Sequence, residues 1–174
     1  MRIALTGGIA CGKTTLAACL NRLGVETLDA DDIVHELVPT DERRRIADAI
    51  FADPALRRAH EAKLHPIVRE RLAAFASAPG DGKIRIEIIP LLFECHWEAD
   101  YDIILCVSSP RRLQISRMVN ARGYTEEQAE ARLAAQLPTE AKAARSDYVI
   151  MNDGSVDQLE TEAQKMVEWL KGRI

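Results

Sequence analysis

Residues Gly7 to Thr14 of this 174-residue chain read Gly-Gly-Ile-Ala-Cys-Gly-Lys-Thr, which matches the pattern G-x-x-x-x-G-K-[ST]. The octapeptide follows an apolar run at Ile3 to Thr6 and precedes a segment with apolar residues at helical spacing. A strand, a glycine-rich turn and a helix in this order form a phosphate-binding loop, whose backbone N–H groups converge on phosphate oxygens at the helix N-terminus. A chance glycine turn is a poor alternative, because both flanks agree with the motif. The chain is therefore expected to bind ATP or GTP.

The loop assigns expected roles to several side chains. Lys13 should reach the β- and γ-phosphates, the Thr14 hydroxyl should ligate magnesium, and the Thr15 hydroxyl can donate to the α-phosphate. The other loop positions are expected to contact ATP through their backbone, namely Gly8, Ala10, Cys11 and Gly12. The thiol of Cys11 is either a tolerated small side chain or an oxidation-sensitive switch.

Five apolar, partly β-branched runs are predicted to be strands. They are Ile3 to Thr6, Val25 to Leu28, Ile84 to Ile89, Ile103 to Val107 and Tyr148 to Ile150. The segments between them show helical spacing, and Thr125 with Gln128 and Ser155 with Gln158 form capping boxes that mark helix starts. Strands that alternate with helices indicate an α/β fold with a parallel sheet covered on both faces.

A long helical stretch from Asp41 to Ala78 interrupts this alternation, with Asp53-Pro54 and His65-Pro66 predicted as breaks inside it. We interpret residues 36–80 as an inserted helical subdomain. With 47% apolar residues, the whole chain, 1–174, has enough material for one core and is expected to be one domain.

Three carboxylates crowd the carboxyl end of the second predicted strand, at Asp29, Asp31 and Asp32. Open parallel sheets bind their ligands at this edge, and acids so close together need nearby cations, for which magnesium and Lys13 are available. Helix capping explains one of the three. Asp31 is the candidate to accept or orient the proton of an attacking hydroxyl in phosphoryl transfer.

Three arginines, Arg117, Arg122 and Arg132, fall in a predicted pair of helices within residues 114–140. Each alone is consistent with an ordinary solvated side chain. As a group they suit a lid that closes over ATP, because guanidinium groups match phosphate oxygens and a closed lid excludes water. Arg122 is the first candidate for a phosphate contact and Arg132 the second.

The composition restricts the partners and the compartment. The net charge of −4 argues against a nucleic-acid partner. The longest apolar run, Ile88 to Phe93, is far shorter than the roughly 20 residues of a bilayer-spanning helix, which argues against a membrane. Glycines and Lys13 interrupt the N-terminal apolar run, and the four cysteines lack metal-ligand spacing. A cytoplasmic protein is expected, as a monomer or a weak homo-oligomer.

Taken together, these motifs resemble the dephospho-CoA kinase family along nearly the whole chain. The matching segments are Leu5 to Ile9 with Gly12 to Thr15, Asp29 to Asp31 with Ile33 and His35, Leu64 to Pro66, Pro90 to Glu94, Gln114 with Arg117, the segment around Arg122, Ala135 with Gln136, and Asp147 to Ile150 with Asn152 and Gly154. The resemblance implies a P-loop kinase fold with three layers, a five-stranded parallel sheet, a helical region that grips the CoA part of the substrate, and a lid. It implies magnesium, ATP and dephospho-CoA as partners.

The resemblance also implies site residues. It makes Asp31 the proton acceptor, so that Lys13, Asp31 and Arg122 are the expected catalytic group. It places Asn152 with the ATP-binding residues and puts His65, Arg69, Pro90 and Leu91 on the substrate side. Independently of the resemblance, Glu87 and Glu94 flank the end of the third strand, and either could assist magnesium through water. The family more often carries an acid where this chain has Ile88, so the second magnesium carboxylate stays open.

Three departures from the family pattern are Ala10-Cys11 in place of Gly-Ser, Met151 in place of an aspartate, and a short region after Pro39. Two other functions stay open at this point. One is a P-loop kinase of another nucleoside, nucleotide or metabolite alcohol, and the other is a relative that binds ATP without transferring phosphate. A panel of acceptors distinguishes them.

Overall fold

The computed structural model of the chain describes residues 1–38, 54–79 and 82–174. Its centre is a five-stranded sheet in the order β2-β3-β1-β4-β5, and every neighbouring pair of strands is parallel. The strands are β1 (Ile3–Gly7), β2 (Glu26–Asp29), β3 (Arg85–Ile88), β4 (Ile103–Ser108) and β5 (Tyr148–Met151). The predicted α/β class and parallel sheet are confirmed, with strand ends that differ from the prediction by at most one residue.

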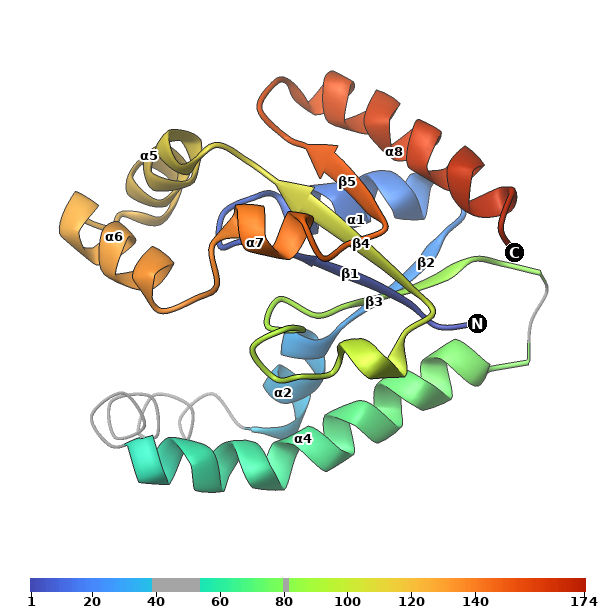
Figure 1. Ribbon diagram of the computed structural model, residues 1–174, viewed down its shortest axis with the longest axis horizontal. Helices are drawn as coiled ribbons and strands as arrows, with labels where there is room; N and C mark the ends of the chain where they lie inside the picture. Colours follow the sequence, from blue (N-terminus) through green and yellow to red (C-terminus); the bar gives the residue numbers. More distant parts are fainter. Residues whose placement is uncertain (39–53, 80–81) are drawn as a thin grey trace.

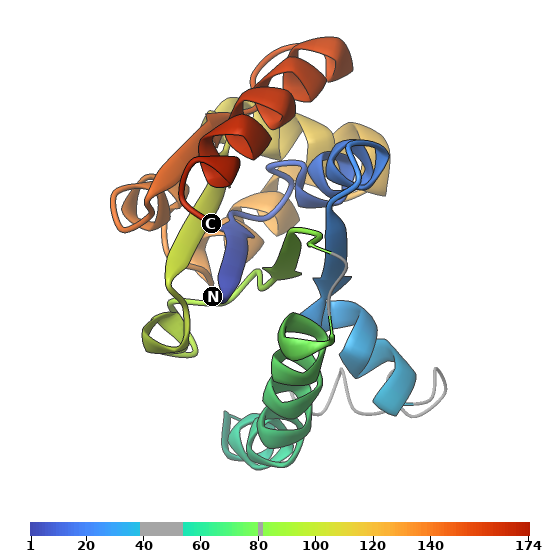
Figure 2. The same ribbon diagram turned by 90° about the vertical axis from the view of Figure 1, so that its right-hand side faces the viewer.

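Helices cover both faces of this sheet (Figures 1 and 2). They are α1 (Lys13–Arg22), α2 (Ala30–Leu37), α4 (Pro54–Ser77), α5 (Arg111–Arg122), α6 (Glu126–Ala134), α7 (Thr139–Ala143) and α8 (Val156–Lys171), with a short 3-10 turn at Glu98–Asp100. The capping boxes at Thr125 and Ser155 form as predicted and begin α6 and α8.

Two apolar cores lie between the sheet and the helices that cover it. On one face, α1 and α8 bury Leu16, Leu20 and Met166 against the strands. On the other face, α2, α4 and the chain after β3 bury a second set around Ile33 and Phe93. The sheet is therefore covered by apolar side chains on both sides, which explains why its central strands β1 and β4 read as continuous apolar runs.

The predicted break at His65-Pro66 is wrong, because α4 continues through Pro66 as one helix from Pro54 to Ser77. Proline removes one intrahelical hydrogen bond and costs helix stability. Val68 and Leu72, which follow it, are buried in the second core, and this tertiary packing outweighs the local preference. The other predicted break coincides with the start of α4 at Pro54, a position that proline tolerates. Asp53 and the rest of 39–53 lie outside the described residues.

All five strands point the same way, so their carboxyl ends meet at one edge of the sheet. The phosphate loop follows β1, the aspartates follow β2, and Pro90 follows β3. In Figure 1, α5 and α6 lie beyond this same edge. Among the described helices, none is both long and apolar enough to cross a bilayer.

Candidate active site at the carboxyl edge of the sheet

The phosphate loop has the backbone geometry that its sequence predicts. Gly12 lies at φ 94°, in the left-handed region that favours glycine, immediately before α1 begins at Lys13. The Lys13 ammonium folds back over the loop, where Nζ donates hydrogen bonds of 2.8 Å to the carbonyls of both Gly7 and Gly8. Thr14 and Thr15 are exposed in the first turn of α1. The loop thus presents a cation and two hydroxyls at a helix N-terminus, which suits a phosphate chain.

Asn152, at the end of β5, supports the loop from behind. Its side chain is buried, and Nδ2 donates a 2.8 Å hydrogen bond to the carbonyl of Cys11. Arg117 of α5 adds bonds to the carbonyl of Ala10 at 3.2 Å and to that of Asn152 at 3.0 Å. A Cβ on Gly12 would come within 2.2 Å of Asn152 Nδ2, so the contact requires glycine. Asn152 and Arg117 therefore shape the loop through its carbonyl groups.

The thiol of Cys11 points away from the phosphate side and is fully buried. The Gln114 side-chain amide lies 3.2 Å from its sulfur and donates a 2.7 Å hydrogen bond to the carbonyl of Ile9. Thr139 completes this buried cluster, with its hydroxyl 3.7 Å from the sulfur. Burial removes the thiol from solvent oxidants, so the geometry favours the interpretation of Cys11 as a small packing residue.

A cavity of about 260 Å³ opens over the loop and α1. Its lining residues are Ala10, Gly12, Lys13, Thr14, Thr15, Arg117, Ala121 and Arg122. Five of the predicted loop residues are thus brought together with Arg122, whereas Gly8 lines a different cavity and Cys11 is buried. Arg132 is not among them, because its guanidinium carbon lies 4.3 Å above the ring of Tyr124.

The three aspartates after β2 have different surroundings. Asp29 is the N-cap of α2, and its Oδ1 accepts a 2.9 Å hydrogen bond from the Asp31 backbone N–H. Partial desolvation raises the pKa of both Asp29 and Asp31, although Asp31 keeps an exposed side, and the positive charge of Lys13 opposes the rise. Desolvation likewise lowers the pKa of Lys13. Capping accounts for Asp29, as expected for one of the three, and leaves Asp31 available for chemistry.

A second cavity, of about 220 Å³, lies between α2, α4 and the chain after β3. Asp31 lines it, together with Ala30, Val34, His60, Leu64, His65, Val68, Ile89, Pro90, Leu91, Cys95 and Trp97. The ring of His65 packs edge-on against Trp97, with centroids 5.0 Å apart and an interplanar angle of 82°. We call this the Trp97 cavity. It joins one carboxylate to walls that are mostly apolar, an arrangement that suits a hydroxyl on a substrate with a flat or apolar body.

Arg69 is the predicted substrate residue that does not line the Trp97 cavity. Its guanidinium pairs with Asp100 and lies 5.8 Å from the ring centroid of Trp97. Trp97 itself was not singled out in the sequence, because a lone tryptophan in a loop carries no spacing signal.

The two acids near the end of β3, Glu87 and Glu94, are both engaged by other side chains rather than open to a magnesium ion. Glu87 is fully buried in β3, where both oxygens accept bonds from Arg2 and Oε2 accepts a 2.6 Å bond from the Tyr101 hydroxyl. Glu94 is paired with Lys142 of α7, with 2.8 Å between Oε1 and Nζ. Lys142 has a fully buried side chain. Lys142 has no signal in the sequence, because a lysine in a short helix is typical of a solvated surface.

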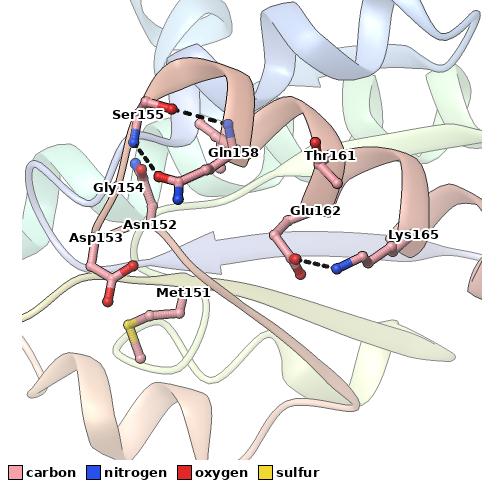
Figure 3. A pocket seen from close by; sticks show the side chains of 10 residues that line it. Met151, Asn152, Asp153, Gly154, Ser155, Gln158, Thr161, Glu162 and Lys165 are labelled. Carbon is pink, nitrogen blue, oxygen red and sulfur yellow. Dashed lines mark hydrogen bonds and ion pairs between the residues drawn. The ribbon is translucent and has the colours of Figure 1, made fainter.

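A third hollow, of about 550 Å³, lies beside the end of β5 and α8 (Figure 3). Its walls include Met151, Thr161, Glu162 and Lys165, and the last two form an ion pair. Of the predicted site residues it contains only Asn152, whose amide is already bonded to the phosphate loop. This hollow therefore brings no further predicted site residues together.

A phosphate loop with its lysine, a carboxylate on the adjacent cavity wall and a parallel sheet in the order 2-3-1-4-5 define a P-loop kinase of small molecules. The family model described as dephospho-CoA kinase matches residues 1–44 and 40–158. The chain belongs to the dephospho-CoA kinase family.

Individual relatives agree with this assignment. A protein of Frankia casuarinae named dephospho-CoA kinase is 33% identical over 98% of this chain and 84% of its own length. The crystal structure of a Thermus thermophilus protein superposes with a TM-score of 0.82, at 33% identity over 98% of this chain and 97% of that one. A dephospho-CoA kinase from Campylobacter jejuni has the same fold, with a TM-score of 0.73 at 24% identity over 99% and 98% of the two chains.

The comparisons are consistent with a short region after Pro39. The family model matches in two segments that overlap at residues 40–44. The alignment with the Frankia relative spans 193 positions, more than the 174 residues of this chain, so that relative carries residues which this chain lacks. The region itself lies outside the described residues.

Proposed function

We propose that the chain transfers the γ-phosphate of ATP to the ribose 3'-hydroxyl of dephospho-CoA, giving CoA and ADP, the last step of coenzyme A synthesis. The observation that carries the proposal is the position of Asp31. It lines the Trp97 cavity and also acts electrostatically on Lys13 of the phosphate loop. The membership of the chain in the dephospho-CoA kinase family supports the choice of acceptor.

On the ATP side, Lys13 is the main cation. Its ammonium would exchange the carbonyls of Gly7 and Gly8 for oxygens of the β- and γ-phosphates, which carry more negative charge. Arg122 lines the same cavity and would add a guanidinium to the transferring phosphate. The predicted phosphate contact of Arg132 requires it to leave the ring of Tyr124, which is consistent with the proposed lid over residues 114–140.

Magnesium fits the oxygen donors that this site offers. The exposed Thr14 hydroxyl in the first turn of α1 would hold it, together with phosphate oxygens of ATP. Among the described residues, no group of three His, Cys, Asp or Glu side chains is arranged to hold a metal ion, so the nucleotide itself would supply most of the ligands. When bound, magnesium neutralises charge that develops on the phosphate oxygens.

On the acceptor side, Asp31 would take the proton of the ribose hydroxyl as its oxygen attacks the γ-phosphorus, while the bond to the leaving ADP breaks. Desolvation raises the pKa of Asp31 and makes it a stronger base than an ordinary aspartate. His65, Pro90 and Leu91 on the walls of the cavity would hold the substrate around this hydroxyl. Arg69 would contact a substrate anion only after release from Asp100.

The remaining assignments are part of the same proposal. Residues 36–80 would form the substrate-side subdomain of a single domain, in a monomer or a weak homo-oligomer. None of the four cysteines, all within the described residues, forms a disulfide, which suits the reducing cytoplasm.

An assay of ADP release with dephospho-CoA, adenosine and AMP in parallel tests this function. We expect turnover with dephospho-CoA and a product with the mass of CoA. Turnover with adenosine or AMP alone would indicate a kinase of another acceptor. Tight ATP binding without ADP release for any acceptor would indicate a relative that only binds the nucleotide.

A further inference from the structure

We propose that Lys142 is a positioning residue for the acceptor, which fixes the Pro90–Leu91 wall of the Trp97 cavity and ties it to α7. The inference rests on the proposed function, because it concerns the same acceptor site. Lys142 lies in α7 with a side chain that is 0% exposed. Its Nζ donates a 2.7 Å hydrogen bond to the carbonyl of Pro90 and forms a 2.8 Å ion pair with Glu94 Oε1.

A buried ammonium is costly to keep in a protein of this size, since an apolar side chain of similar shape would fill the same space without desolvation. The charge could serve only to balance Glu94. However, the lysine has a second partner, the Pro90 carbonyl, which is neutral and needs no charge to balance it. The position of this carbonyl therefore depends on Lys142 directly.

The same two partners connect Lys142 to the rest of the site. The Pro90 carbonyl also accepts a 3.3 Å hydrogen bond from the Thr6 hydroxyl, in the strand that leads into the phosphate loop. Glu94 Oε1 also accepts a 3.0 Å bond from the backbone N–H of Leu137, in the segment before α7. Through these contacts Lys142 connects three parts of the site. They are β1, the Pro90–Leu91 wall and the segment around Leu137 that leads from α6 to α7.

Pro90 and Leu91 form the wall of the cavity that Asp31 also lines. A shift of about 1 Å in such a wall moves the acceptor hydroxyl out of line with the γ-phosphate, which can slow transfer by roughly 100-fold. Loss of Lys142 should therefore affect the acceptor more than ATP, since Asn152 and Arg117 hold the phosphate loop from outside α7, whereas Thr139 of α7 contacts it through the buried side of Cys11.

The test compares Lys142→Met, Glu94→Gln and the double variant, with Lys171→Met on the exposed end of α8 as the matched control. For each protein we measure the melting temperature, KM for ATP and for dephospho-CoA, and binding of dephospho-CoA by calorimetry. Lys142→Met should melt at a lower temperature, because it leaves the Glu94 carboxylate without its cation. The double variant should recover much of this loss but keep a KM and Kd for dephospho-CoA raised at least ~10-fold, with KM for ATP within ~2-fold of wild type.

Full recovery of dephospho-CoA binding in the double variant would overturn the proposal, because Lys142 would then serve only to balance Glu94. An equal rise in both KM values would also overturn it. If both lysine variants fail to fold, Thr6→Val decides, since it removes the other donor to the Pro90 carbonyl and spares the buried ion pair. It should raise the Kd for dephospho-CoA about 3-fold, and an unchanged Kd would contradict the proposal. Wild type that binds dephospho-CoA without phosphorylating it would refute the proposed function alone.

Discussion

Lys13 and Asp31 each favour the charged form of the other, although desolvation acts against the charge on both. Lys13 belongs to the loop after β1 and Asp31 to the helix after β2, and β3 lies between these strands in the sheet. Parallel strands bring the two side chains to the same edge. The cation that would bind the transferring phosphate therefore lies beside the base that would take the acceptor proton.

Replacement of Asp31 should lower kcat without weakening ATP binding. Asp31→Asn keeps the shape of the side chain but removes its proton acceptor, so kcat should fall at least ~100-fold while the Kd for ATP stays within a few-fold of wild type. Asp32→Asn, in the same turn of α2, is the matched control and should retain near-wild-type kcat. Steady-state kinetics with calorimetry for ATP checks both, and a fast Asp31→Asn enzyme would remove the assigned role.

The pH dependence of activity follows from the raised pKa of Asp31. A base works in its ionised form, so kcat/KM should fall as the pH drops through this pKa, with a midpoint above the value of about 4 for a free aspartate. A profile measured from pH 4 to pH 8 checks this. A fall in kcat/KM with a midpoint at or below about pH 4 would contradict the raised pKa of Asp31.

The raised pKa of Asp31 also predicts an effect on the free energy of unfolding. An ionised acid in a salt bridge stabilises the folded state, whereas ionised Asp31 should destabilise it. The folded state binds the Asp31 proton more tightly than the unfolded state, so ionisation of Asp31 lowers the free energy of unfolding at pH values above its pKa. Asp31→Asn should therefore melt at the same or a higher temperature than wild type at pH 7, and the difference should shrink in acid. A clearly lower melting temperature at pH 7 would show that Asp31 stabilises the fold.

Gly8 of the phosphate loop lies against Thr139 of α7, and this contact can be tested. A Cβ on Gly8 would come within 2.1 Å of Thr139 Oγ1, so Gly8→Ala should lower stability by about 1–3 kcal/mol and weaken ATP binding. Thr139→Ala in the same chain removes that oxygen and should restore part of both losses. Urea unfolding and ATP titration of the two single variants and the double variant measure the coupling. Strictly additive losses would contradict a direct contact.

Two arginines of the proposed lid should differ in importance. Arg122 lines the phosphate cavity, whereas Arg132 lies over the ring of Tyr124. Arg122→Ala should lower kcat/KM for ATP by roughly 10- to 100-fold, and Arg132→Ala should lower it less. Equal losses would indicate that Arg132 leaves Tyr124 and reaches the phosphates in the reacting complex.

The sequence predicts those parts of the site that depend on local pattern. The phosphate loop, the acid after β2 and the strands follow from residues within about ten positions of one another. The break expected at Pro66 does not occur, because burial of Val68 and Leu72, a tertiary effect, keeps α4 continuous through it. Lys142 and Trp97 could not be found from local pattern. Their roles depend on contacts with residues that are distant in the sequence, such as Pro90 and His65.

The central claim is that phosphate held by the loop passes to the one hydroxyl whose proton Asp31 accepts. The most direct test measures ADP release by the wild-type protein with dephospho-CoA and with its 3'-deoxy analogue, at equal occupancy of the acceptor site. We expect steady turnover with the first compound and only background ATP hydrolysis with the second. Equal ADP release with both would contradict it, because the phosphate would then be going to another group.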